Sequence, residues 1–171
     1  MKPWRKLGER VVYDRFRRLR SRTFALPGGE VADFEVLDLN DSVAVLALTD
    51  ERGVVLVREF RPGPEEMLLG LPGGVVEQGQ SAYEAARAEL LEETGYEGEL
   101  QVVGTLFKDA YATSTKHVVA ATGCRRVAEP ERPELTEPVV LSLDEFREHL
   151  RSGRLTDTDA AFRALEFLGL L

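Results

Sequence analysis

Runs of apolar residues in the middle of the chain predict a β-hairpin and further strands. Residues 42–48 (SVAVLAL) and 54–60 (VVLVREF) are apolar and β-branched, and the segment between them contains an Asp and a Gly that suit a turn. A shorter apolar stretch at 67–71 leads into Pro-Gly-Gly. Two more runs, 100–107 and 118–122, predict additional strands.

Three later segments have the sequence features of helices. The S-x-x-E spacing of a capping box at 81–84 is followed by good helix formers, which predicts a helix over 82–93 that ends at Gly95. The same spacing at 142–145 predicts a second helix, and a last helix is expected from about Thr158. The first of these helices directly follows the Gly-Gly turn.

The start of the chain and a proline-rich segment near its end have different patterns. Short strand patterns separated by turn residues occur at 11–13, 19–26 and 34–37. They predict a small β piece over residues 1–40, followed by one domain over 41–171. Within that domain, the acidic and proline-rich stretch 129–138 predicts a loop.

The composition fits a single core, with 171 residues of which 43% are hydrophobic and 30% charged. The net charge of −8, from 22 Lys and Arg against 30 Asp and Glu, argues against a protein held on nucleic acid by phosphate contacts. The single cysteine, Cys124, excludes an internal disulfide and favours a cytoplasmic setting. We expect neither a targeting segment nor a membrane span, because no stretch reaches the roughly 18 apolar residues needed to cross a bilayer.

Basic residues are concentrated at the start of the chain. Residues 1–22 contain nine Lys or Arg and two acids. Such a run fits an exposed or dimer-contacting arm, or a basic wall that draws a phosphate-bearing ligand toward an acidic metal site.

The first predicted helix carries acids on the face that its small apolar residues share. At about 100° per residue, Glu89, Glu92 and Glu93 lie on one arc with Ala85 and Ala86. Partly buried carboxylates in neighbouring turns repel one another and need either protons or a cation. Mg²⁺ prefers oxygen ligands and is commonly shared between carboxylates and substrate phosphates, so the arc indicates phosphate chemistry. The alternative is a solvated acidic helix.

Residues 74–96 read GVVEQGQSAYEAARAELLEETGY and resemble the Nudix box, G-x5-E-x7-R-E-U-x-E-E-x-G-U, where U is bulky and apolar. The spacing is complete, with two departures: Gln80 stands at a position of Glu, and Ala88 at a position of Arg. The first removes a carboxylate near the metal, and the second removes a cation that positions an acid. The surrounding order, with REFRPG before the box and an acidic loop after it, resembles the ADP-ribose pyrophosphatase branch.

The resemblance implies a fold and an activity. The fold is a Nudix-type α/β/α sandwich of the α/β class, with a mixed β-sheet and a small N-terminal β piece that in the family often exchanges across a homodimer. The activity is that of a pyrophosphohydrolase that uses water and Mg²⁺, with Mn²⁺ as an alternative ion. The first substrate expected is ADP-ribose, cleaved to AMP and ribose 5-phosphate, followed by another nucleotide sugar or a dinucleotide. Neither nucleic acid nor a membrane is expected as a partner.

Four positions in and before the box are candidate metal ligands. The resemblance implies ligation by the carboxylates of Glu89, Glu92 and Glu93 and by the backbone carbonyl of Gly73. The Gly-Gly turn suits that role, since no side chain at Gly73 keeps the carbonyl from an ion. Glu92 and Glu93 are also expected to be catalytic.

The general base and the substrate contacts are expected outside the box. In this branch the base can come from an acid on a mobile loop, which here points to Glu137, with Glu134 as its neighbour. Arg61 and Arg58 are candidate substrate-binding residues, because the planar fork of arginine suits a phosphate. A plain salt bridge is the alternative for these arginines.

Two other functions fit the same residues. One is a non-catalytic nucleotide-binding sensor that keeps the fold and the metal acids but has lost turnover through Gln80 and Ala88. The other is a nucleoside triphosphate pyrophosphohydrolase. Product analysis separates the two enzymes, because a triphosphatase releases pyrophosphate whereas the expected cleavage gives two monophosphates.

Overall fold

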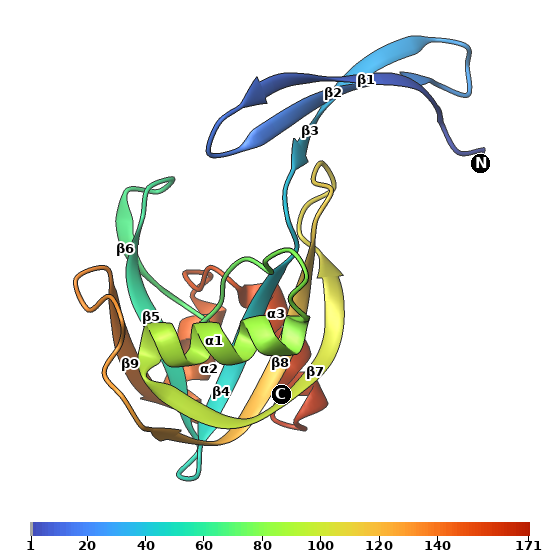
Figure 1. Ribbon diagram of the computed structural model, residues 1–171. Coiled ribbons are helices and arrows are strands. Elements are labelled where there is room, and N and C mark those ends of the chain that lie inside the picture. Colours follow the sequence, from blue (N-terminus) through green and yellow to red (C-terminus); the bar gives the residue numbers. More distant parts are fainter. Residues whose placement is uncertain (1) are drawn as a thin grey trace. The chain divides into compact units, whose positions relative to one another are not determined.

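The computed structural model describes residues 2–171, which divide into two units (Figure 1). The first, here called the N-terminal unit, consists of the chain up to Asn40 together with Phe107–Thr115. The second, the main unit, consists of Asp41–Leu106 and Lys116–Leu171. Among the described residues, no helix is both long and apolar enough to cross a membrane.

Three antiparallel strands form the sheet of the N-terminal unit, in the order β1-β2-β3. They are β1 (Arg5–Asp14), β2 (Arg18–Ala25) and β3 (Val31–Asp38). β2 lies within one residue of the run that predicts it, whereas β1 and β3 are longer than their apolar runs predict. The reason is that charged side chains occupy many of their positions and pair with one another across the sheet, so the strands lack a continuous apolar pattern.

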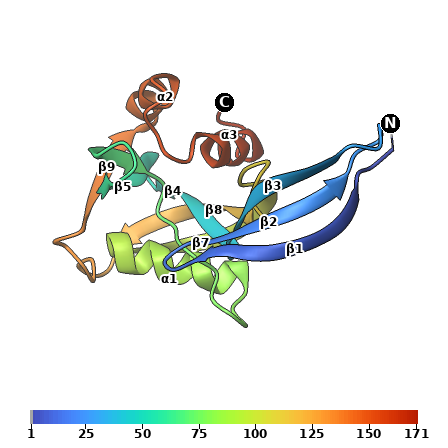
Figure 2. The ribbon, with the colours of Figure 1, turned by 90° about the horizontal axis from the view of Figure 1, so that it is seen from above.

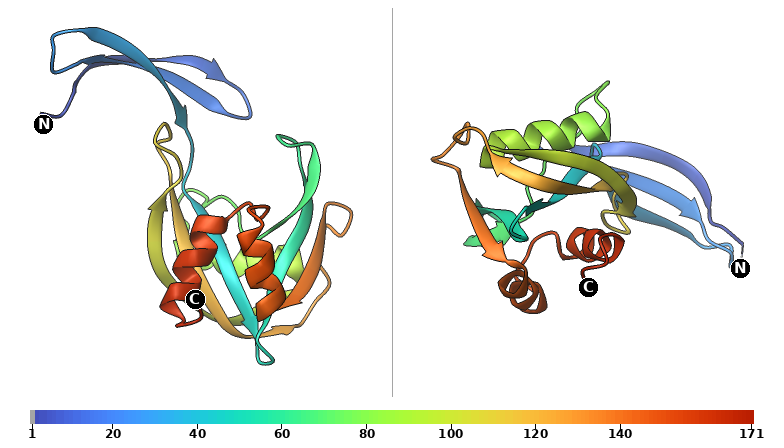
Figure 3. Two further views of the ribbon diagram at one scale, coloured as in Figure 1. Left: turned by 180° about the vertical axis from the view of Figure 1, so that it is seen from behind. Right: turned by 90° about the horizontal axis from the view of Figure 1, so that it is seen from below.

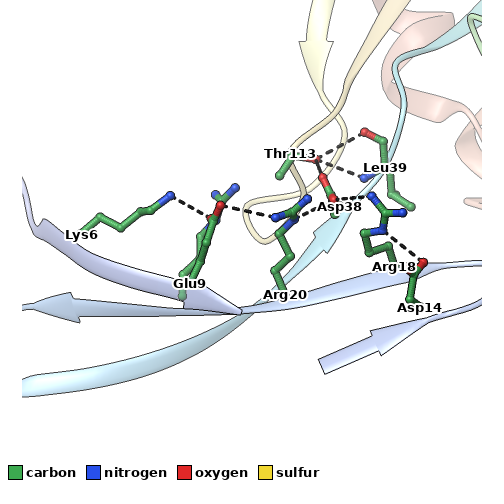
Figure 4. A network of polar contacts seen from close by, with 9 residues as sticks. Lys6, Glu9, Asp14, Arg18, Arg20, Asp38, Leu39 and Thr113 are labelled. Carbon is green, nitrogen blue, oxygen red and sulfur yellow. Dashed lines mark hydrogen bonds and ion pairs between the residues drawn. The ribbon is translucent and has the colours of Figure 1, made fainter. Parts of the chain in front are cut away.

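Ion pairs form within and between these strands (Figure 4). Arg20 Nε donates to Asp38 at 2.7 Å, and Lys6 Nζ donates to Glu9 at 2.8 Å. Thr113 Oγ1, in the second segment of the same unit, also lies 3.4 Å from Asp38 Oδ1. Hydrogen bonding to Arg20 lowers the pKa of Asp38, and hydrogen bonding to Lys6 lowers the pKa of Glu9. Three more basic residues have acidic partners here: Arg10, Arg18 and Arg22.

The main unit is built on a six-stranded sheet in which the order β6-β5-β4-β8-β7 is completed by β9 on β5. The strands are β4 (Ser42–Thr49), β5 (Gly53–Arg61), β6 (Glu66–Gly70), β7 (Tyr96–Phe107), β8 (Thr115–Arg126) and β9 (Thr136–Ser142). β4 runs parallel to β8, whereas β5 is antiparallel to β4, β6 and β9. The sheet is therefore mixed, and the predicted hairpin of β4 and β5 is confirmed.

Three helices cover this sheet: α1 (Ala82–Thr94), α2 (Leu143–Arg151) and α3 (Thr158–Phe167). Figures 2 and 3 show α1 on one face and α2 with α3 on the other. Side chains alternate accordingly along β4. Val45 packs in a cluster with Ala86 of α1, and Leu46 packs in a second cluster with Phe146 of α2 and Ala161 of α3. The predicted α/β/α sandwich with a mixed sheet is confirmed.

The prediction of a loop over 129–138 is wrong at its C-terminal end. β9 already begins at Thr136 and pairs with β5 from Glu59↔Thr136 to Gly53↔Ser142. The edge of β5 would otherwise leave its backbone groups unpaired, and this pairing outweighs the local preference of an acidic, proline-containing segment. Pro138 is tolerated because an edge strand has one side free of ladder hydrogen bonds.

Candidate active site

The segment after β6 crosses from β5 to β4 and carries the Gly-Gly turn to the centre of the sheet. Val45 N donates to Pro72 O at 2.8 Å, and Val43 N donates to Gly74 O at 2.9 Å. A Cβ atom on Gly73 would lie 2.2 Å from Val43 O, closer than any side chain can approach. Glycine is therefore required for this segment to lie against β4.

Helix α1 begins and ends where the sequence predicts. Ser81 accepts a hydrogen bond from Glu84 N, and the Glu84 carboxylate accepts one from Ser81 N at 2.9 Å, which forms a complete capping box. Gly95 has a φ of 73° and donates its N–H to Leu91 O. The two caps fix the length of the helix and thus the position of its acids.

Two of the three predicted acids point inward against the Gly-Gly turn. Gly73 N donates to Glu93 Oε2 at 2.9 Å. A Cβ atom on Gly74 would lie 1.9 Å from Glu89 Oε1, so the missing side chain makes room for the carboxylate. Glu89 and Glu93 are half-buried, as the shared arc with the alanines predicts, whereas Glu92 is exposed.

Burial changes the protonation of these acids. Desolvation, reinforced by the charges of Glu89 and Glu59, raises the pKa of Glu93 to about 8, although the hydrogen bond from Gly73 opposes the change. Desolvation also raises the pKa of Glu89, with added repulsion from Glu92 and Glu77. An uncompensated negative charge on either carboxylate is unfavourable in this partly buried site, and a bound cation would offset that cost.

A pocket of about 480 Å³ opens beside the helix, and most of its charged residues are acids. It is lined by Glu59, Phe60, Glu89, Glu92, Glu93, Glu131, Arg132, Leu135 and Thr136. The three predicted helix acids are therefore brought to one cavity. The walls contributed by β5 and by the segment before β9 were not predicted as parts of the site.

Glu59 is one of two pocket acids that the sequence reasoning missed, the other being Glu131. Glu59 lies on β5, forms an ion pair with Arg61, and has a pKa raised by burial despite that arginine. The charge of Arg61 also lowers the pKa of Glu93. The predicted residue Arg61 thus lies near the helix acids. The i, i+2 spacing of Glu59 and Arg61 on a strand could have indicated that both share a face.

The structure places Arg58 and Glu137 together, but not among the residues that line the pocket. They are direct neighbours on β5 and β9, with Arg58 Nη1 3.0 Å from Glu137 Oε2. Glu137 lies in a strand, so its expected position on a mobile loop is wrong. Glu59 and Thr136, one residue away on each strand, line the pocket, and alternation directs Arg58 and Glu137 to the opposite face.

The donor set fits a hard divalent cation that is shared with a ligand. Across residues 2–171, no three Asp, Glu, His or Cys side chains are grouped so as to enclose an ion by themselves. Mg²⁺ often takes only one or two protein carboxylates and completes its octahedron with water and phosphate oxygens. The inward-facing pair of Glu89 and Glu93, next to the backbone of the Gly-Gly turn, meets that requirement.

Comparison with known proteins agrees with this geometry. A family described as the NUDIX domain matches residues 38–159. The chain belongs to the Nudix family. Its members are pyrophosphohydrolases that generally use a divalent metal, and this chain is a Nudix pyrophosphohydrolase.

Several known proteins are similar to this chain over most of its length. The methanol dehydrogenase activator of Bacillus methanolicus is 28% identical over 95% of this chain and 90% of the relative. The ADP-ribose pyrophosphatase of Bacillus subtilis is 29% identical over 85% and 80%. The CMP-5'-(N-acetyl-N-hydroxy-3-aminopropyl)phosphonate hydrolase of Streptomyces rubellomurinus is 34% identical over 98% and 83%.

A solved structure also has the same fold. The crystal structure of an ADP compounds hydrolase matches with a TM-score of 0.80, covering 100% of this chain and 98% of that chain at 22% identity.

The two departures from the Nudix box have different structural consequences. Gln80 closes the turn before α1, because its Oε1 accepts from Glu77 N at 3.1 Å and its N donates to Glu77 O at 3.0 Å. A neutral amide therefore supports the loop at this position. Ala88 leaves no cation beside Glu89, and the neighbouring Arg87 is exposed. The site accordingly depends more on an added cation to balance its acids.

Proposed function

We propose that this Nudix protein hydrolyses the pyrophosphate bond of ADP-ribose in the presence of Mg²⁺, giving AMP and ribose 5-phosphate. The observation that carries the proposal is the pair of half-buried carboxylates, Glu89 and Glu93, whose pKa values are raised in a pocket dominated by acids. Relatives described as ADP-ribose pyrophosphatases, in Bacillus subtilis and Mycobacterium tuberculosis, support this substrate class.

In this proposal Glu89 and Glu93 hold the ion together with the carbonyl of Gly73. Pro72 and Gly74 give their carbonyls to β4, and the Gly73 N–H donates to Glu93 on the other side. Because the N–H and C=O of one residue in an extended chain point the same way, the Gly73 carbonyl is directed toward the acids. Glu92 adds a third carboxylate at the exposed edge of the pocket.

The chemistry follows from the charges of substrate and site. When bound, Mg²⁺ would neutralise phosphate charge and lower the pKa of an attacking water. The carboxylates of α1 would position the ion, and the backbone of the Gly-Gly turn holds Glu93 in place. Glu92 is exposed in the same pocket and is the acid we assign to accept the proton of the attacking water.

Arg61 is proposed to stabilise a phosphate oxygen near these acids. Its Nε is buried and has no hydrogen-bond partner among residues 2–171, while its Nη2 pairs with Glu59. The unused N–H group of such a guanidinium is available to donate a hydrogen bond to a ligand.

The experiment that tests this function is a hydrolysis screen with Mg²⁺ and with Mn²⁺. ADP-ribose, other nucleotide sugars, dinucleotides and nucleoside triphosphates are supplied separately, and products are resolved by chromatography. AMP with ribose 5-phosphate from ADP-ribose is the expected result. Pyrophosphate released from a triphosphate would favour the triphosphatase, and binding of nucleotides without products would favour a sensor.

We also propose a homodimer formed through the N-terminal unit. This unit exposes large apolar side chains, among them Phe16 in the turn between β1 and β2, which is 95% exposed. Four more are about half exposed: Trp4, Val11, Tyr13 and Val31. Such a surface is typical of a contact between chains. Light scattering after gel filtration tests the state, and a mass of one chain would overturn the proposal.

A further inference from the structure

Arg132 is the only arginine or lysine among the residues that line the acidic pocket. Five carboxylates share the cavity with it: Glu59, Glu89, Glu92, Glu93 and Glu131. Within residues 2–171, the Arg132 guanidinium nevertheless forms no hydrogen bond and no ion pair. The charged residues of the N-terminal sheet behave differently, since Arg18, Arg20 and Arg22 all pair with acids.

The backbone of Arg132 is held firmly although its side chain is free. Its carbonyl accepts hydrogen bonds from Leu135 N at 2.9 Å, from Thr136 N at 3.1 Å and from Thr136 Oγ1 at 3.2 Å. The preceding residue, Glu131, donates its N–H to Glu92 O at 2.8 Å. The Cα position of Arg132 is thereby tied to the helix that carries the metal acids.

A cation that shares a pocket with these acids but pairs with none of them can bind an anionic ligand. An unpaired arginine in a pocket keeps all its donors for a ligand, and guanidinium binds the non-bridging oxygens of a phosphate bidentately. A nucleoside diphosphate brings more than one negative charge to the pocket. The carboxylates, without a cation, would repel it.

We propose that Arg132 binds the pyrophosphate of the substrate directly and so sets the preference of the pocket for a diphosphate over a monophosphate. The inference rests on the proposed function. It adds a permanent cation, supplied by the chain itself, on the segment before β9 that lines the same pocket. This residue lies outside the Nudix box, and no motif in the sequence indicates it.

Equilibrium binding tests the proposal without turnover. Isothermal titration with Mg²⁺ present compares α,β-methylene-ADP, whose bridging carbon resists hydrolysis, with AMP. The variants are Arg132→Gln, Arg132→Lys and the matched control Arg87→Gln, since Arg87 is another exposed arginine without an ion pair among the described residues, located outside the pocket. Thermal unfolding of each variant verifies the fold.

We expect Arg132→Gln to weaken binding of α,β-methylene-ADP by about 10- to 100-fold, the usual effect of losing a charge-assisted hydrogen bond. Binding of AMP should weaken by less than about threefold, because AMP lacks the second phosphate. Arg132→Lys should be intermediate, and Arg87→Gln should match the wild type. The decline of affinity with added KCl should also be shallower in Arg132→Gln, because one ion contact is lost.

Other outcomes are decisive as well. Arg132→Gln within about twofold of wild type for the diphosphate, equal losses for both ligands, or no binding of α,β-methylene-ADP by the wild type would each overturn the role of Arg132. A wild-type protein that binds the diphosphate through Arg132 but releases no AMP from ADP-ribose would overturn the proposed function and leave this inference intact.

Discussion

Two acids, Asp38 in the N-terminal unit and Glu93 in the main unit, have opposite environments. In the N-terminal sheet, Asp38 is hydrogen-bonded to Arg20 and its pKa is lowered (Figure 4). In the main unit, Glu93 is half-buried near Glu89 and Glu59, and desolvation raises its pKa to about 8. The comparison distinguishes acids whose counter-charge belongs to the fold from acids whose counter-charge must come from outside. Acids of the first kind stabilise the structure, whereas acids of the second kind mark a candidate site for a bound cation.

The largest expected effect is the loss of turnover when an acid of the pocket is substituted. Glu93→Gln removes a proposed metal ligand, and we expect ADP-ribose hydrolysis to fall by about 10³-fold, because several kcal/mol of charge stabilisation are lost. The fold should persist, since the amide retains the shape of the side chain. Steady-state kinetics measures the effect, with Glu99→Gln, an exposed acid outside the pocket, as control. Activity within tenfold of wild type would contradict the assignment.

Glycines in the two units should respond differently to an added methyl group. Gly74→Ala places a Cβ 1.9 Å from Glu89 Oε1, so the carboxylate must move. We expect activity to drop by about 10²-fold, since misplacement of a reacting group by about 1 Å has this effect. Gly28→Ala, in the N-terminal unit, has no atom within 4 Å of its new Cβ and should keep full activity. Equal kinetics of the two variants would show that Glu89 needs no fixed position.

The stability of the main unit should fall as pH rises, because the pKa of Glu93 is raised on folding. A carboxyl group whose pKa is lowered on folding has the opposite effect. The pKa of Glu93 is about 8 in the folded protein, whereas in the unfolded chain it returns to 4.5, the ordinary value for a glutamate. The folded state therefore binds more protons between these values, and stability falls as pH rises through this window. We expect the Tm of metal-free protein to decrease from pH 5 to pH 8, and Mg²⁺ at pH 8 to restore it. A Glu93→Gln protein with the same pH dependence would argue against this origin.

The stability of the N-terminal sheet should decrease at low pH instead. Because the pKa of Asp38 is lowered from 3.8, its contribution is present above that value and is lost as pH falls through the folded pKa. Asp38→Asn should reduce stability by about 1 kcal/mol, as expected for a partly exposed ion pair with a hydrogen bond. Amide hydrogen exchange in β2 and β3 measures the change. Unaltered protection there would mean that the pair adds nothing to the sheet.

The smallest effect is expected for the exposed pair on the far face of the main sheet. Glu137→Gln breaks its contact with Arg58, which should cost at most about 1 kcal/mol, because both side chains are solvated. Turnover of ADP-ribose should stay within about twofold of wild type, since neither residue lines the pocket. A 100-fold loss would instead identify Glu137 as the general base.

Local features of the sequence predicted much of the fold and the three helix acids of the site. The capping box at Ser81, the terminating Gly95 and the arc of Glu89 and Glu93 depend on residues within a few positions of one another, so spacing alone was sufficient. Local spacing could not predict the pairing between strands that are distant in the chain. Glu59 enters the pocket because β5 pairs with β9, whose residues are more than 70 positions away in the chain.

The segment between β8 and β9 is hydrogen-bonded to α1 and to its C-terminal cap through main-chain atoms. Val127 N donates to Gly95 O at 2.8 Å, and Glu131 N donates to Glu92 O at 2.8 Å. Side-chain replacements at Arg132 and its neighbours leave these attachments unchanged. This part of the pocket lining can therefore diversify by single substitutions, in evolution or in the laboratory, while the acids proposed to bind the metal keep their positions.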